Sequence, residues 1–235
     1  MTLAAESLLA LLIIGLYLND SVSLLPGNQA MLAQGVRGQW AARFAARRFT
    51  LLGKHVFVGG VLPPNTLLFK LAWTMEADAP ASPGWEAYGQ RLRPFQWAAA
   101  FLLVVIMVLL PLALVLRAGD AAVLTLLALT YTSIVGVWIA LWLARHRLEL
   151  SSAYCLKLGA EMLLCPPVAV NLPRRISLQR AVDEDFVSAC RRLLPPSQWA
   201  DAAESLVMRI DDELESEDAG STRHVQLTQR KESLV

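Results

Sequence analysis

Two long stretches without a charged residue constrain this chain more than any other feature of its sequence. Residues 95–116 read FQWAAAFLLVVIMVLLPLALVL, and residues 121–144 read AAVLTLLALTYTSIVGVWIALWLA. A helix needs about 20 apolar residues to span the roughly 30 Å hydrocarbon core of a bilayer, and both stretches meet this length. Only the residues RAGD separate them, which is enough for a tight turn between antiparallel helices. The sequence therefore predicts a transmembrane helical hairpin.

The overall composition is also typical of a membrane protein. Of the 235 residues, 55% are hydrophobic and 17% are charged, whereas soluble domains carry about 45–50% and about 25%. The net charge of +1 gives no electrostatic basis for binding nucleic acid. The expected partners are therefore the lipid bilayer and other proteins, and no nucleic acid.

The N-terminal segment, residues 1–25, is expected to be another transmembrane helix. Its uninterrupted apolar core runs from Leu8 to Leu18, with Glu6 on one side and Asp20 on the other. A cleaved secretory signal has a basic start, but no basic residue precedes Arg37. We therefore predict an uncleaved signal-anchor helix. The alternative is an amphipathic helix that lies in the plane of the membrane.

Basic residues beside the apolar stretches predict the orientation. Residues 26–96 contain eight Lys or Arg residues and three acidic residues, and Arg145 and Arg147 follow the last stretch. Cytoplasmic flanks of transmembrane helices are enriched in Lys and Arg, and three spans place both basic flanks on the same side. The excess of arginine (17) over lysine (4) hints at a GC-rich bacterial genome. We expect a multi-pass protein of the bacterial inner membrane, with its N-terminus outside and its C-terminus cytoplasmic.

Residues 26–94 are expected to form a small cytoplasmic β-rich unit. A two-residue loop that begins with glycine suits a type II′ hairpin turn, which predicts a turn at Gly53-Lys54. The alternation in TLLFKLAW places Phe69, Leu71 and Trp73 on one face of a strand. The runs that favour strands are Trp40–Ala45, Phe49–Leu52, His55–Val58 and residues 66–73. The result is an antiparallel sheet of three or four strands, which needs a neighbouring surface to be stable.

Residues 145–218 are expected to form a cytoplasmic helical region. The apolar stripe of its clearest helix follows helical spacing and consists of Val182, Phe186, Ala189, Cys190 and Leu193. Pro195-Pro196 ends this helix, and a second helix begins near Ser197, which predicts a helical hairpin. The acidic run DDELESED at residues 211–218 lacks the spaced ligands of a calcium loop and is expected to be a solvated, frayed helix end. The polar residues 219–235 are expected to be disordered.

The cysteines and histidines give no metal-binding pattern. Cys155, Cys165 and Cys190 are ten and twenty-five residues apart, and no CxxC pair occurs. A zinc site needs four ligands at close spacing. The sequence thus predicts no metal and no other cofactor.

No motif identifies a reaction. The chain has no phosphate-binding loop, GxSxG, HExxH, kinase or deaminase signature. Ionisable residues in the apolar segments are confined to Glu6 and Asp20, near the ends, whereas ion pathways place such groups inside a bundle. The favoured function is an integral accessory or scaffold protein that presents cytoplasmic surfaces to partner proteins. A membrane-bound enzyme of unidentified reaction is the alternative, and a small oligomeric transporter is less favoured.

Two sets of residues are candidate contact sites. Thr132, Gly136 and Ala140 form a small-xxx-small series, which allows another helix to approach closely. The segment LLCPPVAVNLPRRISL at residues 163–178 contains three prolines, which exclude a continuous helix. We expect it to lie extended along the cytoplasmic membrane surface, where an arginine gains about 1 kcal/mol beside anionic lipid, and its Cys165 to be buried and inert. The membrane-surface residues predicted here are Cys165, Val168, Arg174 and Arg175.

Overall fold

The structure is a computed structural model, which describes residues 5–47, 49–58, 65–73, 84–218 and 220–234. Most of these residues are helical, and the chain divides into two compact units. The helical unit consists of residues 1–22, 60–67 and 86–177. The mixed unit, which contains most of the strands and the C-terminal helices, consists of residues 23–59, 68–85 and 178–235.

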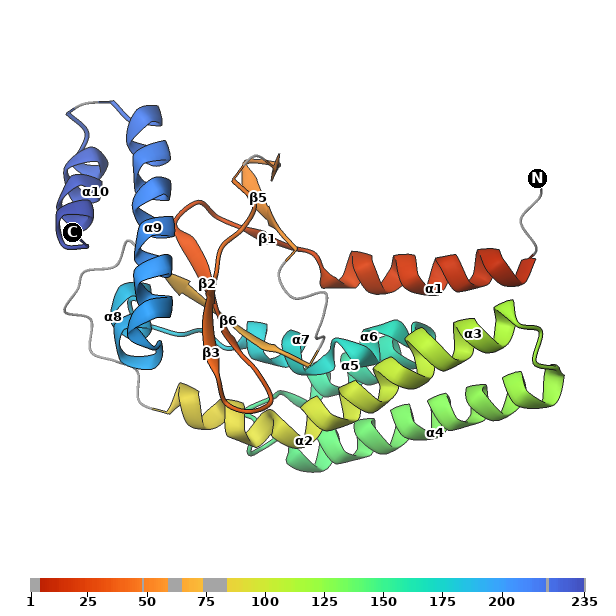
Figure 1. Ribbon diagram of the computed structural model, residues 1–235. Coiled ribbons are helices and arrows are strands. Elements are labelled where there is room, and N and C mark those ends of the chain that lie inside the picture. The colour runs from red at the N-terminus through yellow and green to blue at the C-terminus, as the bar shows by residue number, and fades with distance from the viewer. Residues whose placement is uncertain (1–4, 48, 59–64, 74–83, 219, 235) are drawn as a thin grey trace. The chain divides into compact units, whose positions relative to one another are not determined.

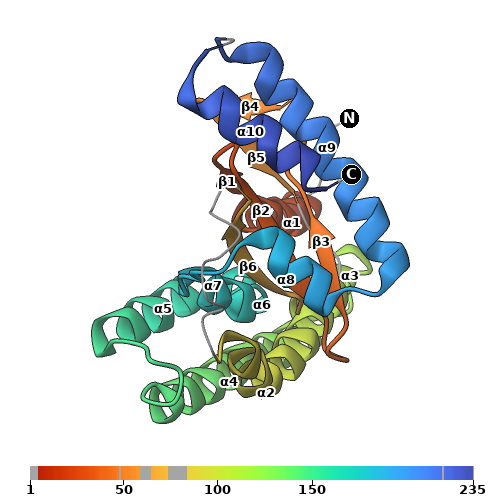
Figure 2. The same cartoon turned by 90° about the vertical axis from the view of Figure 1, so that its left-hand side faces the viewer.

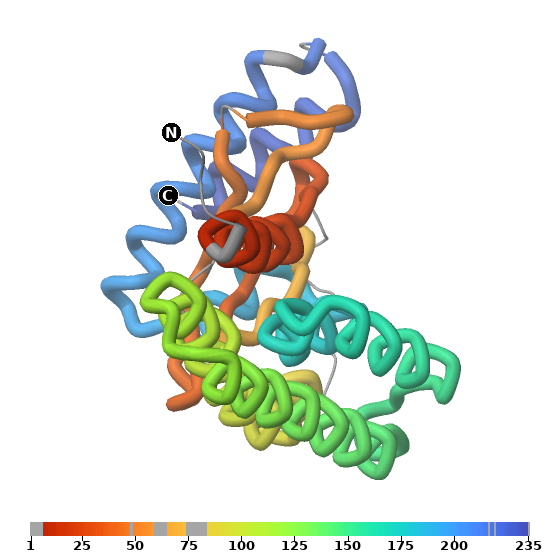
Figure 3. The backbone as a smooth tube through the Cα atoms, turned by 90° about the vertical axis from the view of Figure 1, so that its right-hand side faces the viewer, coloured from red at the N-terminus to blue at the C-terminus, as the bar shows by residue number. Residues whose placement is uncertain are grey.

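Two long apolar helices dominate the helical unit. The first runs from Trp85 to Val115 and the second, α4, from Asp120 to Ala144. They lie side by side in Figures 1 and 3. Both are long and apolar enough to cross a membrane, so the predicted hairpin is present as two candidate membrane-spanning helices.

The first long helix changes its pitch halfway along. It consists of α2 (Trp85–Leu103), the π-helical η1 (Val104–Leu109) and α3 (Leu110–Val115). The wide turn precedes Pro111, and the Leu110 N–H donates to the Val105 carbonyl five residues back. Proline has no N–H and clashes with the carbonyl four residues before it. The π-turn accommodates Pro111 without breaking the helix.

This helix also begins earlier than the sequence predicted. Residues 85–94 were expected in the β-rich segment 26–94, but they form the first turns of α2. An apolar stripe of Tyr88, Leu92, Phe95 and Ala99 is buried along one face, which explains why the helix continues beyond the charge-free stretch. The Tyr88 hydroxyl also donates to the Leu148 carbonyl at 3.1 Å, beyond the end of α4.

The N-terminal helix α1 runs from Ala5 to Ser21 and contacts α3 and α6 within the helical unit. Its 17 residues correspond to about 26 Å, slightly less than the hydrocarbon thickness. Residues Ser23–Leu25, expected at the end of the first span, form strand β1 instead. The third transmembrane helix therefore remains a prediction.

The proline-rich segment 163–178 is not extended, contrary to the prediction. It folds into the end of α5 (Ser152–Leu164), then α6 (Pro167–Val170) and most of α7 (Leu172–Gln179). Pro167 is the first residue of α6 and Pro173 the second of α7. The first turn of a helix needs no N–H at these positions. The prolines therefore divide the segment into short helices.

The mixed unit contains two three-stranded sheets, with strand orders β1-β5-β4 and β3-β2-β6. The described residues thus hold six strands, more than the three or four predicted. Strand β2 was missed because its sequence, QAMLAQ, does not alternate between apolar and polar residues. The further strands are β2 (Gln29–Gln34), β3 (Trp40–Arg43), β4 (Thr50–Leu51), β5 (Lys54–Phe57) and β6 (Leu67–Ala72).

The β4–β5 hairpin has a different turn from the one predicted. Leu51 pairs with Lys54, so the two loop residues are Leu52 and Gly53 and not Gly53 and Lys54. Both have positive φ, 52° and 72°, as a type I′ turn requires. Inside this unit, the buried core that the sheets share consists of Leu25, Met31, Ala33, Ala45, Phe57 and Leu68.

Three helices complete the mixed unit: α8 (Phe186–Leu193), α9 (Pro196–Ser216) and α10 (Thr222–Glu232). The predicted helices on either side of Pro195 are present. Helix α10 corrects the expectation that residues 219–235 are disordered, and Figures 1 and 2 show it beside α9.

Charge pairing explains why the polar C-terminal segment is ordered. Arg223 binds Glu213 at 2.6 Å, and Lys231 binds Asp211 at 2.6 Å. The acidic end of α9 is therefore neutralised by α10. A further pair, Arg230 with Asp185, is almost fully buried, and Arg230 Nε also donates to the Trp73 carbonyl at 3.1 Å.

The Arg230→Gln variant should release α10 while α8 and α9 stay folded. The substitution leaves the buried carboxylate of Asp185 without its cation, which costs about 3 kcal/mol. We expect amide hydrogen exchange in residues 222–232 to accelerate by about 100-fold or more, because about 1.4 kcal/mol corresponds to a factor of ten. The matched control is Arg223→Gln, whose side chain is 51% exposed, and which should change exchange far less. Equal effects of the two variants would contradict this account of α10.

Candidate functional site

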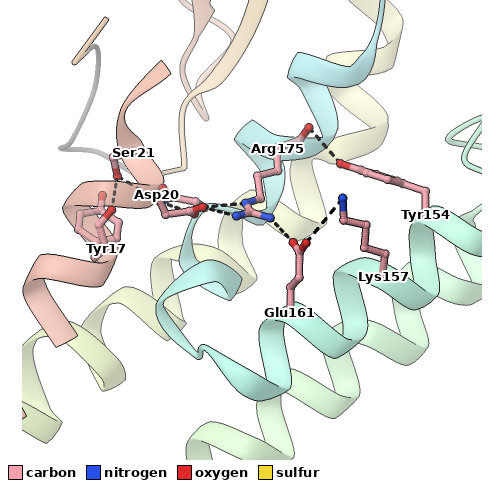
Figure 4. A network of polar contacts seen from close by, with 8 residues as sticks. Tyr17, Asp20, Ser21, Tyr154, Lys157, Glu161 and Arg175 are labelled. Carbon is pink, nitrogen blue, oxygen red and sulfur yellow. Dashed lines mark hydrogen bonds and ion pairs between the residues drawn. The ribbon is translucent and has the colours of Figure 1, made fainter. Parts of the chain in front are cut away.

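A cluster of charged and polar side chains lies at the C-terminal end of α1 and is the strongest candidate site in the helical unit. Asp20 and Ser21 belong to the last turn of α1, Glu161 to α5 and Arg175 to α7, while Asn171 lies between α6 and α7. Figure 4 shows the side chains of Asp20, Ser21, Glu161 and Arg175 converging from segments about 140 and 150 residues apart in the sequence, and Asn171 bonds to the same Asp20. We refer to these five residues as the polar cluster.

Arg175 is the centre of the polar cluster. Its Nε donates to Asp20 Oδ1 at 2.9 Å, and its Nη2 donates to the same oxygen. Its Nη1 donates to Glu161 Oε2. One guanidinium therefore joins carboxylates from two different helices (Figure 4). A guanidinium suits this position because its planar fork of N–H donors matches carboxylate oxygens.

Asn171 completes the coordination of the α1 carboxylate. Its Nδ2 donates to Asp20 Oδ2 at 2.9 Å and to Ser21 Oγ at 3.1 Å. Asn171 and Ser21 are buried, and the Asp20 side chain is only 10% exposed. Both oxygens of Asp20 thus accept hydrogen bonds, as a carboxylate with little access to water requires.

The polar cluster becomes more exposed along α5. Glu161 is one third exposed, and its other oxygen lies 3.9 Å from the ammonium of Lys157, which is 70% exposed. The network therefore passes from a buried end at Asp20 to a solvated end at Lys157 (Figure 4). Contributions to stability should decrease in the same direction, because exposed ion pairs contribute about 0–1 kcal/mol.

Arg174 adds a second guanidinium next to the polar cluster. Its side chain is among the largest that are fully buried in the chain. Burial lowers its pKa, and the nearby Asp20 carboxylate opposes that shift. For Arg175, burial also acts to lower the pKa, but the hydrogen bonds and charges of Asp20 and Glu161 outweigh it and raise the pKa. Asp20 thus acts on both arginines, while Tyr17 is the larger influence that opposes the effect of burial on the pKa of Arg174.

The geometry is that of a structural clamp. The carboxylate of Asp20 is occupied by the Arg175 and Asn171 donors, and that of Glu161 by the two cations beside it. A carboxylate that abstracts protons needs a free oxygen within hydrogen-bond reach of its substrate. Among the described residues, no three His, Cys, Asp or Glu side chains are grouped in a way that could hold a metal ion. The arrangement can fix the end of α1 against the helices that follow α4.

The membrane-surface residues named from the sequence occupy different environments. Val168 and Arg174 are buried, Cys165 is partly exposed at the end of α5, and Arg175 is bound within the polar cluster. The two arginines are thus engaged by the chain's own carboxylates and are not laid out along an open strip. The expectation that Cys165 is buried is wrong, because Cys165 is partly exposed after the end of α5. Its chemical inertness and the contact of the arginines with anionic lipid remain predictions.

The other two thiols are poor nucleophiles. Cys155 in α5 and Cys190 in α8 are both buried, and burial raises the pKa of each. A raised pKa keeps the thiol protonated at neutral pH, and the thiolate is the reactive form. The apolar stripe that contains Cys190 is therefore core, as its helical spacing predicted.

The predicted helix-packing residues lie on an unoccupied face of α4. Thr132, Gly136 and Ala140 are all exposed, and a Cβ at Gly136 would meet no atom within 4 Å. The side chains of α4 that are buried are Thr130, Ile134 and Leu141. The described residues thus leave these three positions exposed.

The polar cluster was largely missed from the sequence. Asp20 was noted only as a boundary of the first apolar segment, and neither Glu161 nor Asn171 was considered. Local signals were present: Lys157 and Glu161 are four residues apart on one helix face, and Asn171 interrupts an otherwise apolar run. Nothing local indicated that these groups meet Asp20.

Comparison with known proteins identifies no relative. No protein-family model matches the chain, and neither does a curated protein or a solved structure.

The Asp20→Asn variant should destabilise the helical unit. It removes the charge that compensates Arg175 at the buried end of the polar cluster, and we expect a cost of about 1–3 kcal/mol. Thermal unfolding of the purified protein in detergent should then shift downward by about 2–12 °C, since about 1 kcal/mol corresponds to 2–4 °C at this size.

The matched control acts on the exposed end of the same network. Lys157→Met should change the unfolding temperature by no more than about 2 °C, because exposed pairs contribute little. If Lys157→Met were as destabilising as Asp20→Asn, the cluster would not be organised around a buried clamp.

Proposed function

We propose that this chain is an accessory or scaffold protein integral to the bacterial inner membrane, which presents interaction surfaces to partner proteins. The observation that carries the proposal is the unoccupied face of α4. Only 11% of the most apolar part of α4 is buried within the structure. A helix that contacts its own chain along one narrow side has most of its surface available to lipid or to another helix.

The composition of that face favours a helix partner. Gly136 lies about 160° around the helix from the buried Ile134, because successive residues are about 100° apart. Thr132 lies at the same angle from Ile134, so Thr132 and Gly136 point away from the chain's own packing, and Ala140 lies at the side of this face, about 100° from the buried Leu141. Small residues permit close approach of two backbones in lipid, where van der Waals contact drives helix association.

The polar atoms near this face support a transport pathway less than they support a contact with a partner helix. Thr125 Oγ1 donates to the Ala121 carbonyl at 2.8 Å, and Ser133 Oγ donates to the Leu129 carbonyl at 2.7 Å. Hydroxyls that bond to their own helix do not offer free ligands to an ion. Transport pathways also use ionisable groups within the membrane, and α4 has none after its first residue, Asp120. The polar cluster likewise gives little support to the enzyme alternative, because its carboxylates are occupied.

The proposed orientation has support from the connections in the helical unit. Asp20, at the C-terminal end of α1, binds α7, and α5–α7 follow the C-terminal end of α4 in the chain. The C-terminal ends of α1 and α4 therefore belong on the same side of the membrane if both helices span it. The basic flanks on this side, including Arg145 and Arg147, favour the cytoplasm.

The Gly136→Leu variant tests whether the small-residue face contacts a partner helix. Leucine at this position should separate the two backbones and abolish the complex on native gels of membranes solubilised in mild detergent, with protein abundance and unfolding temperature unchanged. The matched control is Val135→Phe, which enlarges an exposed side chain about 100° around the helix, outside the series of small residues spaced four apart.

In the same experiment, two differently tagged copies of the chain show whether the partner helix belongs to a second copy of this chain or to another protein. A control variant on the opposite side of the helix, such as Leu141→Ala, is not suitable, because Leu141 is fully buried and its truncation would disturb the packing within the chain. An unchanged complex in Gly136→Leu, or equal losses in both variants, would count against the contact face.

A further inference from the structure

The sheet formed by β1, β5 and β4 has an apolar face that is not covered by the described residues. Large apolar side chains are exposed there: Phe49 is 68% exposed, Leu51 56%, Leu52 88% and Val58 54%. Isolated exposed apolar residues need no explanation, but several in one patch indicate an interaction surface. We refer to these four residues, together with the exposed Lys54, as the outer face.

Strand geometry explains why these residues lie together. Leu51 pairs with Lys54, and the Phe49 carbonyl accepts a hydrogen bond from the Val56 N–H at 2.8 Å. Side chains alternate between the two faces of a strand, so Phe49, Leu51, Lys54 and Val58 share one face. The opposite face carries Phe57, which is buried in the core. An antiparallel sheet with one buried face normally presents polar residues on the other, and this sheet does not.

The turn of the hairpin adds a second observation. Leu52 has a φ of +52° and is the most exposed of the four apolar residues. The left-handed conformation at this position favours glycine, asparagine or aspartate, and it is unfavourable for leucine. The side chain of Leu52 makes little contact within the mixed unit, so folding of the sheet does not account for a leucine here. An apolar tip suits a surface outside the chain.

Chain continuity indicates which surface this is. Helix α1 ends at Ser21, and β1 begins at Ser23. A single residue thus separates the sheet from a helix that, in the proposed function, crosses the membrane and ends at its cytoplasmic boundary. The start of β1, at the edge of the sheet, is therefore tethered within a few ångströms of the lipid headgroups, and because Ser23 pairs with Phe57, the turn at Leu52 lies at the opposite end of the sheet.

The composition of the outer face fits the interfacial zone of a bilayer. Aliphatic and aromatic side chains enter the boundary between headgroups and acyl chains, and basic residues beside them are attracted to anionic lipid. Lys54 supplies such a cation in the middle of the face. We propose that the outer face lies flat in the interfacial zone of the cytoplasmic leaflet, from Val58 near the start of β1 to Leu52 at the far end of the sheet. This inference rests on the proposed function only through the membrane location of α1.

Depth-dependent quenching of a fluorescent label tests the proposal on the full chain. Cys155, Cys165 and Cys190 are first replaced by alanine, and single cysteines are introduced as Leu52→Cys, Ser197→Cys and Val135→Cys. Ser197 is exposed at the start of α9, and Val135 is exposed in the middle of α4. Each variant is labelled with an environment-sensitive fluorophore and reconstituted in vesicles of phosphatidylethanolamine and phosphatidylglycerol. Quenching is measured with aqueous iodide and with lipids that carry a nitroxide near the headgroup or deep in the acyl chain.

We expect the label at position 52 to be quenched several-fold less by iodide than the label at 197, and strongly by the shallow nitroxide. If the labels at positions 52 and 197 were equally sensitive to iodide and insensitive to nitroxide lipids, the outer face would be in water, and the proposal would be wrong. Protection of position 52 from both quenchers would mean that protein covers the face, which also overturns it. The label at position 135 tests separately whether α4 spans the membrane, as the proposed function requires. If the deep nitroxide does not quench this label, α4 does not span the bilayer.

Discussion

The absence of charge in residues 95–116 and 121–144 is the constraint on which the rest of this structure depends. The described residues of the chain leave large apolar side chains of both helices exposed. Their large apolar side chains exposed to the surroundings include Phe101, Val108, Leu124, Ile139 and Leu143. Moving one such side chain out of water is worth roughly 1.5–3 kcal/mol. Both helices are long and apolar enough to cross a membrane, and a bilayer would cover these side chains.

Charged groups must then gather at the ends of the helices. After α4, the Arg145 guanidinium stacks on the Trp142 ring at 4.6 Å and donates to the Trp142 carbonyl at 2.8 Å. At the end of α1, Asp20 is held by Arg175 and Asn171. The second arrangement is more than a boundary marker, because it also joins α1 to α5–α7. A buried carboxylate and a buried guanidinium can both stay charged at a low free-energy cost when they are paired. Removing either one leaves the other as an uncompensated buried charge.

Sequence reasoning succeeded where the signal was contained in one segment. The helical hairpin followed from more than twenty charge-free residues on either side of a short turn, and the stripe around Cys190 followed from spacing alone. It failed where the outcome depends on residues distant in sequence. Helix α10 is polar and would be unstable alone, but Arg230 finds Asp185 and Lys231 finds Asp211. The polar cluster has the same origin, since Asp20 and Arg175 are separated by 155 residues. The prolines at 166, 167 and 173 exclude a continuous helix, as predicted, but the segment between the breaks is helical and not extended.

The central claim is that α2–α3 and α4 form a membrane hairpin whose short turn faces outward, and alkaline phosphatase fusions test it most directly. The enzyme is active only outside the cytoplasm. A fusion after Gly119, in the turn, should therefore be active, and a fusion after Gly220 should be inactive at comparable protein abundance. An active fusion at Gly220 with an inactive one at Gly119 would invert the orientation. Equal activity at both positions would contradict the hairpin itself.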